Sequence, residues 1–525
     1  MRKADHRERW MTGCAAHGMS RRRFLTGCAT CAGAAGLMGV PDWVRAAAQG
    51  SGKPKIRVIY ALHAGVQNRP DWPNIDFDFN PVMERINAGL TRSCPDYVFI
   101  PTMATGPDQA KKILEDDKSA PVDGYLVYQM NCWNQVAQTV AMSGKPVLYA
   151  DFMYAGSGGF LVYTAGFLRA GAHNVGFVAS PRIEDLTAAV RCFEKAKAAG
   201  PGFDFAAETT RVRASRTPLP GDLACRPDAL KSLSVDETIR RMKASKILAV
   251  RDDKAGPDTS IMGVPVVQIP FAEVNEAWAA ADKDEARAIA ERWLKSAALV
   301  ESVSREELIN SAAMYLGQKA VLKKRGANAI TINCLGGFYG GHIHAYPCLG
   351  FHELLNEGLV GACECDVPST AAMVAVTALT QGRPGFISDP VIDASKRHII
   401  YAHCVASNKA FGPQGTANPF QILTHSEDRQ GASVRSLLPA GYMTTTVEVS
   451  EERQEILFHR AKAVGNDPDD RACRTKLVAE PLGDMEKLFT MWDKWGWHRV
   501  TFYGDLKEPV YALADAIGWK VVEEA

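Results

Sequence analysis

Short apolar runs alternate with helical patterns in the first part of the chain. Strand-like runs lie at 56–62, 97–100, 124–128 and 146–150, and helical patterns lie at 82–90, 109–114 and 136–142. Strands that alternate with helices at this spacing are typical of a parallel sheet covered by helices. We therefore predict an α/β unit over residues 53–168. It has no nucleotide-binding signature, because no GxGxxG follows its first strand.

A second α/β unit is predicted over residues 169–400. Its strands are expected at 174–178, 246–250, 265–269 and 329–334, and its helices at 183–199, 271–300 and 305–323. Segment 208–227 has little periodicity and is predicted as a loop; the glycine-rich segments 156–159, in the first unit, and 336–344 are predicted as a turn and a loop. The last of them holds His342 and His344, a weak metal signal that we expect in a solvated loop.

Beyond residue 401 the pattern changes toward alternation of apolar and polar residues. The segments 444–449, 455–461 and 474–480 alternate apolar and polar residues as half-buried strands do. A helix (482–495), a strand (499–503) and a helix (508–517) complete the chain. The predicted fold class is α/β, with two Rossmann-like parallel-sheet domains followed by a C-terminal domain, residues 401–525, built on an antiparallel β-sheet or barrel.

Length and charge narrow the possible functions. At 525 residues the chain is long enough for two or three domains. The net charge is +1, but the first 48 residues carry an excess of five positive charges, so that the remainder is mildly acidic, at −4. Nucleic-acid binders use a basic surface, which this body lacks, and we exclude that class.

Residues 1–48 have the pattern of an export signal. Ser20-Arg21-Arg22-Arg23-Phe24-Leu25 precedes a Gly/Ala-rich apolar run, and Ala46-Ala47-Ala48 offers small residues for cleavage. This order resembles a twin-arginine signal and predicts a periplasmic or extracellular protein. An ordinary secretory signal or an anchor is the alternative, but the apolar run is short for a membrane span. We expect no stable membrane insertion after signal removal.

Ten cysteines remain after Cys14, Cys28 and Cys31 leave with the signal. Export permits disulfides. The ten cysteines are scattered, however, and none forms a CxxC pair. Several lie in apolar, strand-like runs, which favours buried free thiols.

An acidic turn at residues 360–373 is the first candidate for chemistry. The apolar residues before Glu364 suit a buried strand, and Pro368 suits the first position of the following helix. Glu364 and Asp366 then lie at the carboxyl end of a strand, where open α/β sheets place their ligands. Considered alone, the turn is better explained by a helix cap at Asp366 and a surface charge at Glu364.

Acids and histidines recur at strand ends further along the chain. Asp389 and Asp393 follow one apolar run, His403 ends the next, and His498 precedes the last strand. Side chains at the ends of separate strands can converge on one point. Two carboxylates with two imidazoles would form a ligand set suited to Mn²⁺ or a similar divalent cation.

These residues carry a family resemblance. The run Glu364-Cys365-Asp366-Val367-Pro368, continued by Gly382-Arg383-Pro384-Gly385, Ile387-Ser388-Asp389 and Tyr401-Ala402-His403, resembles the metal-binding core of L-arabinose isomerases. The ending Trp497-His498-Arg499-Val500-Thr501-Phe502-Tyr503-Gly504 is similar to that of L-fucose isomerases. The resemblance covers residues 329–525 well and the two preceding units more weakly, and it implies the three-domain architecture of that superfamily.

The resemblance also implies roles for individual residues. The implied metal ligands are Glu364, Asp389, His403 and His498. Glu364 and Asp389 are also the implied proton-transfer groups, and Asp366 would support them by bonding to backbone or to a ligand histidine. Relatives are oligomers, which implies a homo-oligomer here.

The chain departs from the family pattern at several points. Cys365 stands where these enzymes have Gly, Asp389 matches fucose rather than arabinose isomerases, and Arg499 follows the last histidine. The export signal is a further departure, since family members are typically cytoplasmic.

The leading hypothesis is a metal-dependent aldose–ketose isomerase with a small sugar as substrate. A divalent cation would stabilise the enediolate while a carboxylate moves the proton between two carbons. Two alternatives stay open: an exported carbohydrate-binding protein that kept the fold without turnover, and a metal-dependent glycan hydrolase or lyase.

Overall fold

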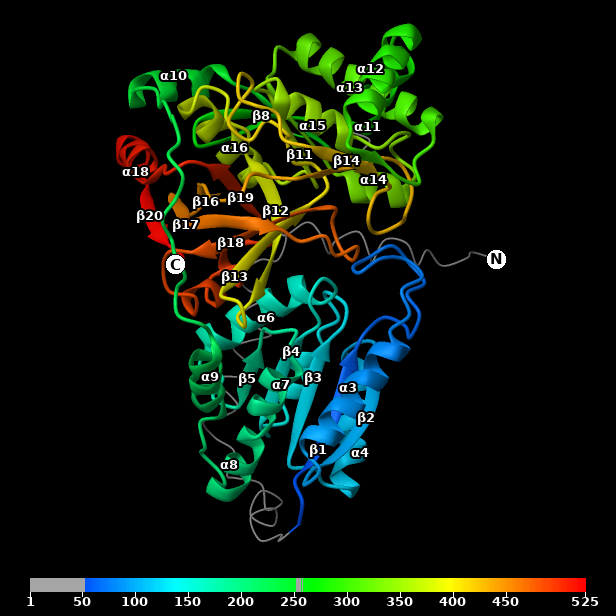
Figure 1. The fold of residues 1–525 in the computed structure, drawn as a ribbon, viewed down its shortest axis with the longest axis vertical. Coiled ribbons are helices and arrows are strands. Elements are labelled where there is room, and N and C mark those ends of the chain that lie inside the picture. Colours follow the sequence, from blue (N-terminus) through cyan, green and yellow to red (C-terminus); the bar gives the residue numbers. More distant parts are fainter. Residues whose placement is uncertain (1–51, 252–255, 257) are drawn as a thin grey trace.

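The computed structural model describes residues 52–251, 256 and 258–525. Figure 1 shows a parallel α/β unit in blue and cyan, a second α/β unit in green and yellow, and a barrel of yellow, orange and red strands between them. The predicted fold class is confirmed, because two parallel-sheet domains precede a C-terminal antiparallel barrel. The export signal predicted over residues 1–48 lies outside the described residues. Within the described part, no helix is both long enough and apolar enough to span a membrane.

The first unit is a five-stranded parallel sheet in the order β2-β1-β3-β4-β5. Its two faces carry separate apolar layers: Ile59 and Val127 pack into one, and Val58 and Leu126 into the other. Helices therefore cover both faces, as a buried parallel sheet requires. The strands are β1 (Lys55–Ala61), β2 (Val98–Ala104), β3 (Gly124–Gln129), β4 (Val147–Asp151) and β5 (Val175–Val178). The helices are α3 (Asn80–Ser93), α4 (Pro107–Ser119), α5 (Val136–Ala141), α6 (Ser157–Ala170), α7 (Ile183–Val190), α8 (Cys192–Ala199) and α9 (Phe205–Arg216).

The second unit is a five-stranded sheet in the order β11-β10-β6-β8-β7, parallel except for β7. Because its central strands are fully buried, their sequences read as continuous apolar runs. The strands are β6 (Ile247–Val250), β7 (Thr259–Ile261), β8 (Val264–Ile269), β10 (Ala329–Ile332) and β11 (Val360–Cys363). The helices are α10 (Val235–Ala244), α11 (Phe271–Ala279), α12 (Lys283–Ser296), α13 (Arg305–Arg325), α14 (Cys334–Gly340), α15 (Cys348–Asn356) and α16 (Val367–Leu379).

The third body is an antiparallel barrel in the order β16-β19-β12-β13-β18-β17, closed by pairing of β17 with β16. Closure leaves none of these six strands as an open edge. The strands are β12 (Phe386–Asp393), β13 (His398–His403), β16 (Met443–Ser450), β17 (Glu455–Asn466), β18 (Thr475–Pro481) and β19 (Arg499–Tyr503), with β20 (Lys520–Glu523) parallel to β17. A small sheet joins β15 (Ser433–Ser436), β14 (Phe420–Leu423) and β9 (Leu299–Val300), and η1 (Lys487–Phe489), α17 (Trp492–Trp495) and α18 (Lys507–Ala516) complete the chain.

Sheet membership moves two of the expected domain boundaries. Strand β5 pairs with β4 and so belongs to the first sheet, although it lies beyond residue 168. Strand β12 pairs with β13 and β19 in the barrel, although it lies before residue 400. Apolar periodicity marks each strand but does not reveal which sheet it joins, because hydrogen bonds to distant strands decide that.

Several local predictions were wrong. Residues 208–216, expected in a loop, continue α9, which Asp204 caps by accepting from the Ala207 amide at 2.8 Å. The expected helix at 271–300 is divided into α11 and α12 by a new cap at Asp282. The glycine-rich segment contains α14, and the helix expected at 482–495 is reduced to η1 and α17.

The expected turn at residues 156–159 instead opens α6. Its glycines allow close packing rather than chain reversal. A Cβ atom on Gly158 would lie 2.6 Å from the Trp497 ring, and one on Gly156 would lie 2.1 Å from the Gln129 carbonyl oxygen. The first unit therefore reaches the barrel at a point next to His498.

Candidate metal centre

The structure brings together all four of the residues expected as ligands. Glu364 follows β11, Asp389 lies in β12, His403 ends β13 and His498 precedes β19. One ligand atom from each lies within 4.8 Å of all the others. Sheet register explains much of this: Asp389 pairs with Ala402, next to His403, and Ser388 pairs with Arg499, next to His498. Glu364 enters from the second α/β unit.

The distances among these four side chains are short. His498 Nε2 lies 3.1 Å from an Asp389 oxygen and 3.5 Å from a Glu364 oxygen. His403 Nε2 lies 3.6 Å from Glu364 and 3.9 Å from Asp389. Asp389 Oδ1, His403 Nε2 and His498 Nε2 are buried without a hydrogen-bond partner among the described residues. Buried polar atoms are normally satisfied, so these converging atoms fit a shared cation.

The turn that carries Glu364 has an unusual backbone. Glu364 and Cys365 have φ angles of 62° and 53°, in the left-handed region. For residues other than glycine this conformation costs about 1–2 kcal/mol each, which explains why glycine suits the position of Cys365. The turn nevertheless directs the Glu364 carboxylate from the end of β11 toward the barrel.

Asp366 has both of the roles that the sequence suggested. Its Oδ1 accepts a hydrogen bond from the Ser369 amide at 3.0 Å and caps α16. Its Oδ2 lies 2.8 Å from His498 Nδ1. Because a carboxylate only accepts, the proton of a neutral His498 lies on Nδ1, and the Nε2 lone pair faces the acids. Asp366 thus orients a candidate ligand.

His403 differs from His498 in its second nitrogen. The Cys404 amide donates to His403 Nδ1 at 2.9 Å, which places the proton of a neutral ring on Nε2. His403 can therefore bind a cation through Nε2 only if its ring flips or if the hydrogen bond from the Cys404 amide to Nδ1 is lost. The donor set fits a cation most directly through Glu364, Asp389 and His498.

The two carboxyl groups have opposite pKa shifts. Burial favours the neutral form of Glu364, but His498 and His403 outweigh it and lower the pKa of Glu364. Burial prevails at Asp389 and raises its pKa. For His498, burial disfavours the charged ring, yet Glu364, Asp366 and Asp389 together raise its pKa. The different environments thus move the pKa values of Glu364 and Asp389 apart, as in sites where one carboxyl group accepts a proton and another donates one.

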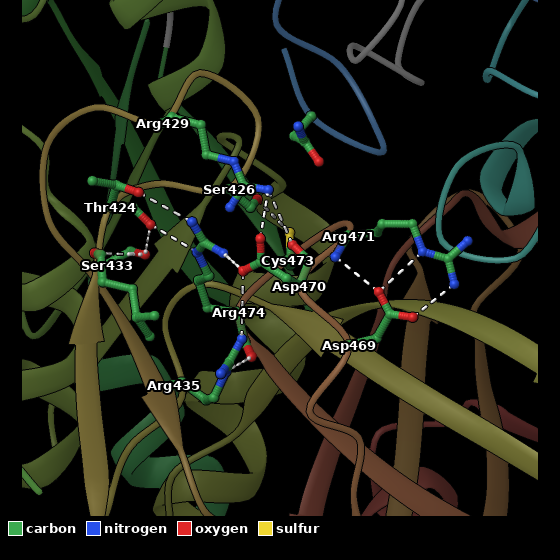
Figure 2. Close-up of polar contacts among 12 residues, drawn as sticks. Thr424, Ser426, Arg429, Ser433, Arg435, Asp469, Asp470, Arg471, Cys473 and Arg474 are labelled. Atoms are coloured by element: carbon green, nitrogen blue, oxygen red, sulfur yellow. Dashed lines mark hydrogen bonds and ion pairs between the residues drawn. The ribbon is translucent and has the colours of Figure 1, made fainter. Parts of the chain in front are cut away.

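Two segments beside the four candidate ligands, 424–435 and 469–474, form a wall of the site that the sequence did not predict. Figure 2 shows segment 424–435, a loop that runs into β15, and loop 469–474 joined by polar contacts, in which Arg474 donates to the Thr424 carbonyl oxygen at 2.8 Å. Arg429 pairs with Asp470 at 2.8 Å in the same wall. Cys473 lies at its inner side, with Sγ 3.9 Å from Asp389 Oδ2. No sequence motif marks these loops, because long-range contacts assemble them.

Other sequence candidates lie apart from the cluster. Asp393, at the far end of β12, accepts hydrogen bonds from the backbone and hydroxyl of Ser395. His342 and His344 are exposed; His342 stacks on Phe271, and His344 meets Trp278 edge to face. The ten cysteines in the described part are free thiols, and all but Cys225 are buried.

Comparison with known proteins shows which proteins have a similar sequence. No family model matches the chain. Sulfoquinovose isomerase from Clostridium sp. (strain MSTE9) is 26% identical over 211 residues, which cover 39% of this chain and 46% of the relative. Sulfoquinovose isomerases from Priestia aryabhattai (26% over 130 residues; 24% and 28% covered) and Alkalicoccus urumqiensis (23% over 161 residues; 29% and 36% covered) also match. The chain thus spans less than half the length of these curated relatives.

The chain also matches solved structures, at low similarity. A solute-binding protein of an ABC transporter from Bacillus halodurans, with bound myo-inositol, is 16% identical and covers 56% of this chain and 82% of its own, at a TM-score of 0.18. The relatives that match by sequence are sugar isomerases as a class. The particular proteins to which the chain is similar are sulfoquinovose isomerases.

Proposed function

We propose that this protein is a metal-dependent aldose–ketose isomerase that acts through an enediolate. The observation that carries the proposal is the convergence of Glu364, Asp389, His403 and His498, with three buried atoms that lack any other partner among the described residues. Glu364, Asp389 and His498 would hold the cation, with His403 completing the set. Carboxylate and imidazole ligands suit Mn²⁺ or a similar ion.

The proposed chemistry moves a carbonyl group between C1 and C2 of an open-chain sugar. When bound, the cation supplies Lewis-acid stabilisation of negative charge on the sugar oxygens. Glu364, whose pKa is lowered, is ionised and accepts the carbon-bound proton beside the carbonyl. The same proton returns to the neighbouring carbon, so the step needs no oxidant or reductant. Asp389, the second implied proton-transfer group, would accept the hydroxyl proton from one sugar oxygen and return it to the other.

The remaining elements of the proposal come from the sequence and its relatives. We propose export by the twin-arginine route to the periplasm or beyond, because of the motif at residues 20–25. We also propose a homo-oligomer, from the family resemblance. The substrate is proposed to be a sugar, with sulfoquinovose as the first candidate because the relatives are isomerases of that sugar.

The test is an isomerase assay on the purified protein with its metal content controlled. Chelation should abolish interconversion, and Mn²⁺ should restore it for at least one sugar in a panel of aldoses and ketoses. Tight binding of a sugar without interconversion would favour the non-catalytic carbohydrate-binding protein. Release of a fragment from a glycan would favour the hydrolase or lyase.

A further inference from the structure

A single arginine lies at the point where the second sheet reverses its strand order. Arg251 follows β6, which has β8 on one side and β10 on the other. Open α/β sheets bind ligands outside the carboxyl ends of their strands at such a point. The Glu364 turn lies at the same edge, because β11 pairs with β10 in parallel.

The Arg251 guanidinium is held against this turn. Its Nη2 donates to the Cys365 carbonyl oxygen at 3.0 Å and lies 3.2 Å from the Cys365 sulfur. Its Nε lies 3.3 Å from the same sulfur. Cys365 directly follows Glu364, so the guanidinium lies one residue along the chain from a candidate metal ligand.

The contact between Arg251 and the Cys365 sulfur explains why position 365 holds a cysteine rather than a glycine. A residue other than glycine at φ 53° is strained, and a strained residue persists where the surroundings use it. The thiol is the only side-chain partner of Arg251 in the described part of the chain, so glycine at position 365 would leave the guanidinium with its carbonyl contact alone. Cys365 therefore fixes the direction of the Arg251 side chain.

The charge of Arg251 is not balanced by the protein within the described ranges. Among residues 52–251, 256 and 258–525, no carboxylate forms an ion pair with Arg251, and its Nη1 has no hydrogen-bond partner. By contrast, the well-buried Arg383 and Arg499 pair with Asp228 and Glu524. Arg251 is only partly exposed, and a guanidinium in such a place gains most from an anion that presents two oxygens to its planar fork.

We propose that Arg251 binds an anionic substituent of the substrate, a sulfonate, phosphate or carboxylate at the end of the sugar remote from the reacting carbonyl. This inference rests on the proposed isomerase function of the same site. Arg251 would thereby be the residue that selects an acidic sugar, such as the first candidate sulfoquinovose, over a neutral one. Cys365 is a positioning residue in this arrangement, because it acts through Arg251.

The experiment compares D-glucose with D-glucuronate, D-glucose 6-phosphate and 6-deoxy-6-sulfo-D-glucose as substrates of the metal-loaded protein. The measured quantity is the ratio of kcat/KM for an anionic sugar to kcat/KM for glucose. We expect this ratio to be about 10 or more for at least one anionic sugar. Arg251→Gln should reduce this ratio by about 10–100-fold, mostly through KM, in line with the strength of charge-assisted hydrogen bonds. Cys365→Gly should reduce the ratio less.

Arg305→Gln is the matched control, because it removes an exposed arginine of α13 that pairs with Glu291. It should leave the ratio and the bound metal unchanged. A wild-type protein that favours no anionic sugar would overturn the inference, and so would an Arg251→Gln variant that keeps the full ratio. Equal losses for glucose and the anionic sugars would mean that Arg251 has a structural role only.

Failure of the proposed function is distinguishable from failure of this inference. If the wild-type protein interconverts none of the four sugars, calorimetric titration of the same sugars decides the question. If the wild-type protein binds an anionic sugar more tightly than glucose and Arg251→Gln loses this preference, the anion subsite is supported. Equal binding of all four sugars, or no binding, would overturn it.

Discussion

His498 Nδ1 lies 2.8 Å from Asp366 Oδ2, although 132 residues separate the two in the chain. The contact joins the second α/β unit to the barrel. It also selects the tautomer that turns the Nε2 lone pair of His498 toward Glu364 and Asp389. A residue that resembles an ordinary helix cap in the sequence thus orients a candidate ligand.

Asp366→Asn should weaken metal binding by about 10–100-fold. If the amide oxygen keeps the cap of α16, the NH₂ group faces His498 and forces the proton onto Nε2, where a ligand needs a lone pair. Titration of the apoprotein with Mn²⁺ measures the change.

Asp366→Ala should in addition lower the free energy of unfolding by about 1 kcal/mol, because the cap is lost. The matched control is Asp282→Ala, which removes the cap of α12 and should cost the same stability without altering metal affinity. Equal metal affinity in all three variants would contradict the assigned role of Asp366.

Glu364→Gln should lower isomerase activity by about 10²–10⁴-fold, because the amide cannot accept the carbon-bound proton. The fold should persist, as judged by circular dichroism. Glu357→Gln is the control, since it alters a partly exposed carboxylate that pairs with Lys319 at 2.9 Å. Full activity in Glu364→Gln would remove Glu364 from the mechanism.

Gly158→Ala should disturb the site from the first α/β unit. The added Cβ would lie 2.6 Å from the Trp497 ring, and movement of Trp497 displaces His498 next to it. We expect a loss of about 1–3 kcal/mol in stability and weaker metal binding. Gly465→Ala is the control, because a Cβ there meets no atom within 4 Å and should change stability by less than about 0.5 kcal/mol. Unchanged metal affinity in Gly158→Ala would show that the two units are not coupled at this contact.

Glu524 should make stability depend on pH below neutrality. It is buried between Arg499, at 2.6 Å, and His459, at 2.9 Å. Burial opposes ionisation, but Arg499 and His459 outweigh it and lower the pKa of Glu524 from 4.5 to about 2. Because the folded pKa lies below the unfolded one, its contribution is present above about pH 4.5 and is lost as the pH falls toward 2.

The contribution is on the order of 3 kcal/mol. Urea unfolding at several pH values measures it. Glu524→Gln should be less stable than the wild-type protein at neutral pH, because Arg499 is left buried without its counter-charge, and the difference should shrink as the pH is lowered through this window. A constant difference between the two proteins from pH 7 to pH 3 would contradict the assignment.

The sequence by itself determined most of the elements and the candidate ligands. Apolar runs located the strands because parallel strands are buried on both faces, and alternation located the barrel strands because only one face is buried. The acidic turn at Glu364 and its followers Asp389, His403 and His498 were selected by the family resemblance, since the turn considered alone favoured a helix cap.

Only the tertiary structure decided how these pieces combine. The closure of the barrel by β16 and β17, the membership of β5 and β12, and the packing of Gly158 on Trp497 depend on partners far away in the chain. The contact of Arg251 with Cys365 is of the same kind. Periodicity reports how buried a residue is but not against what it is buried, because contacts between distant segments form only when the whole chain folds.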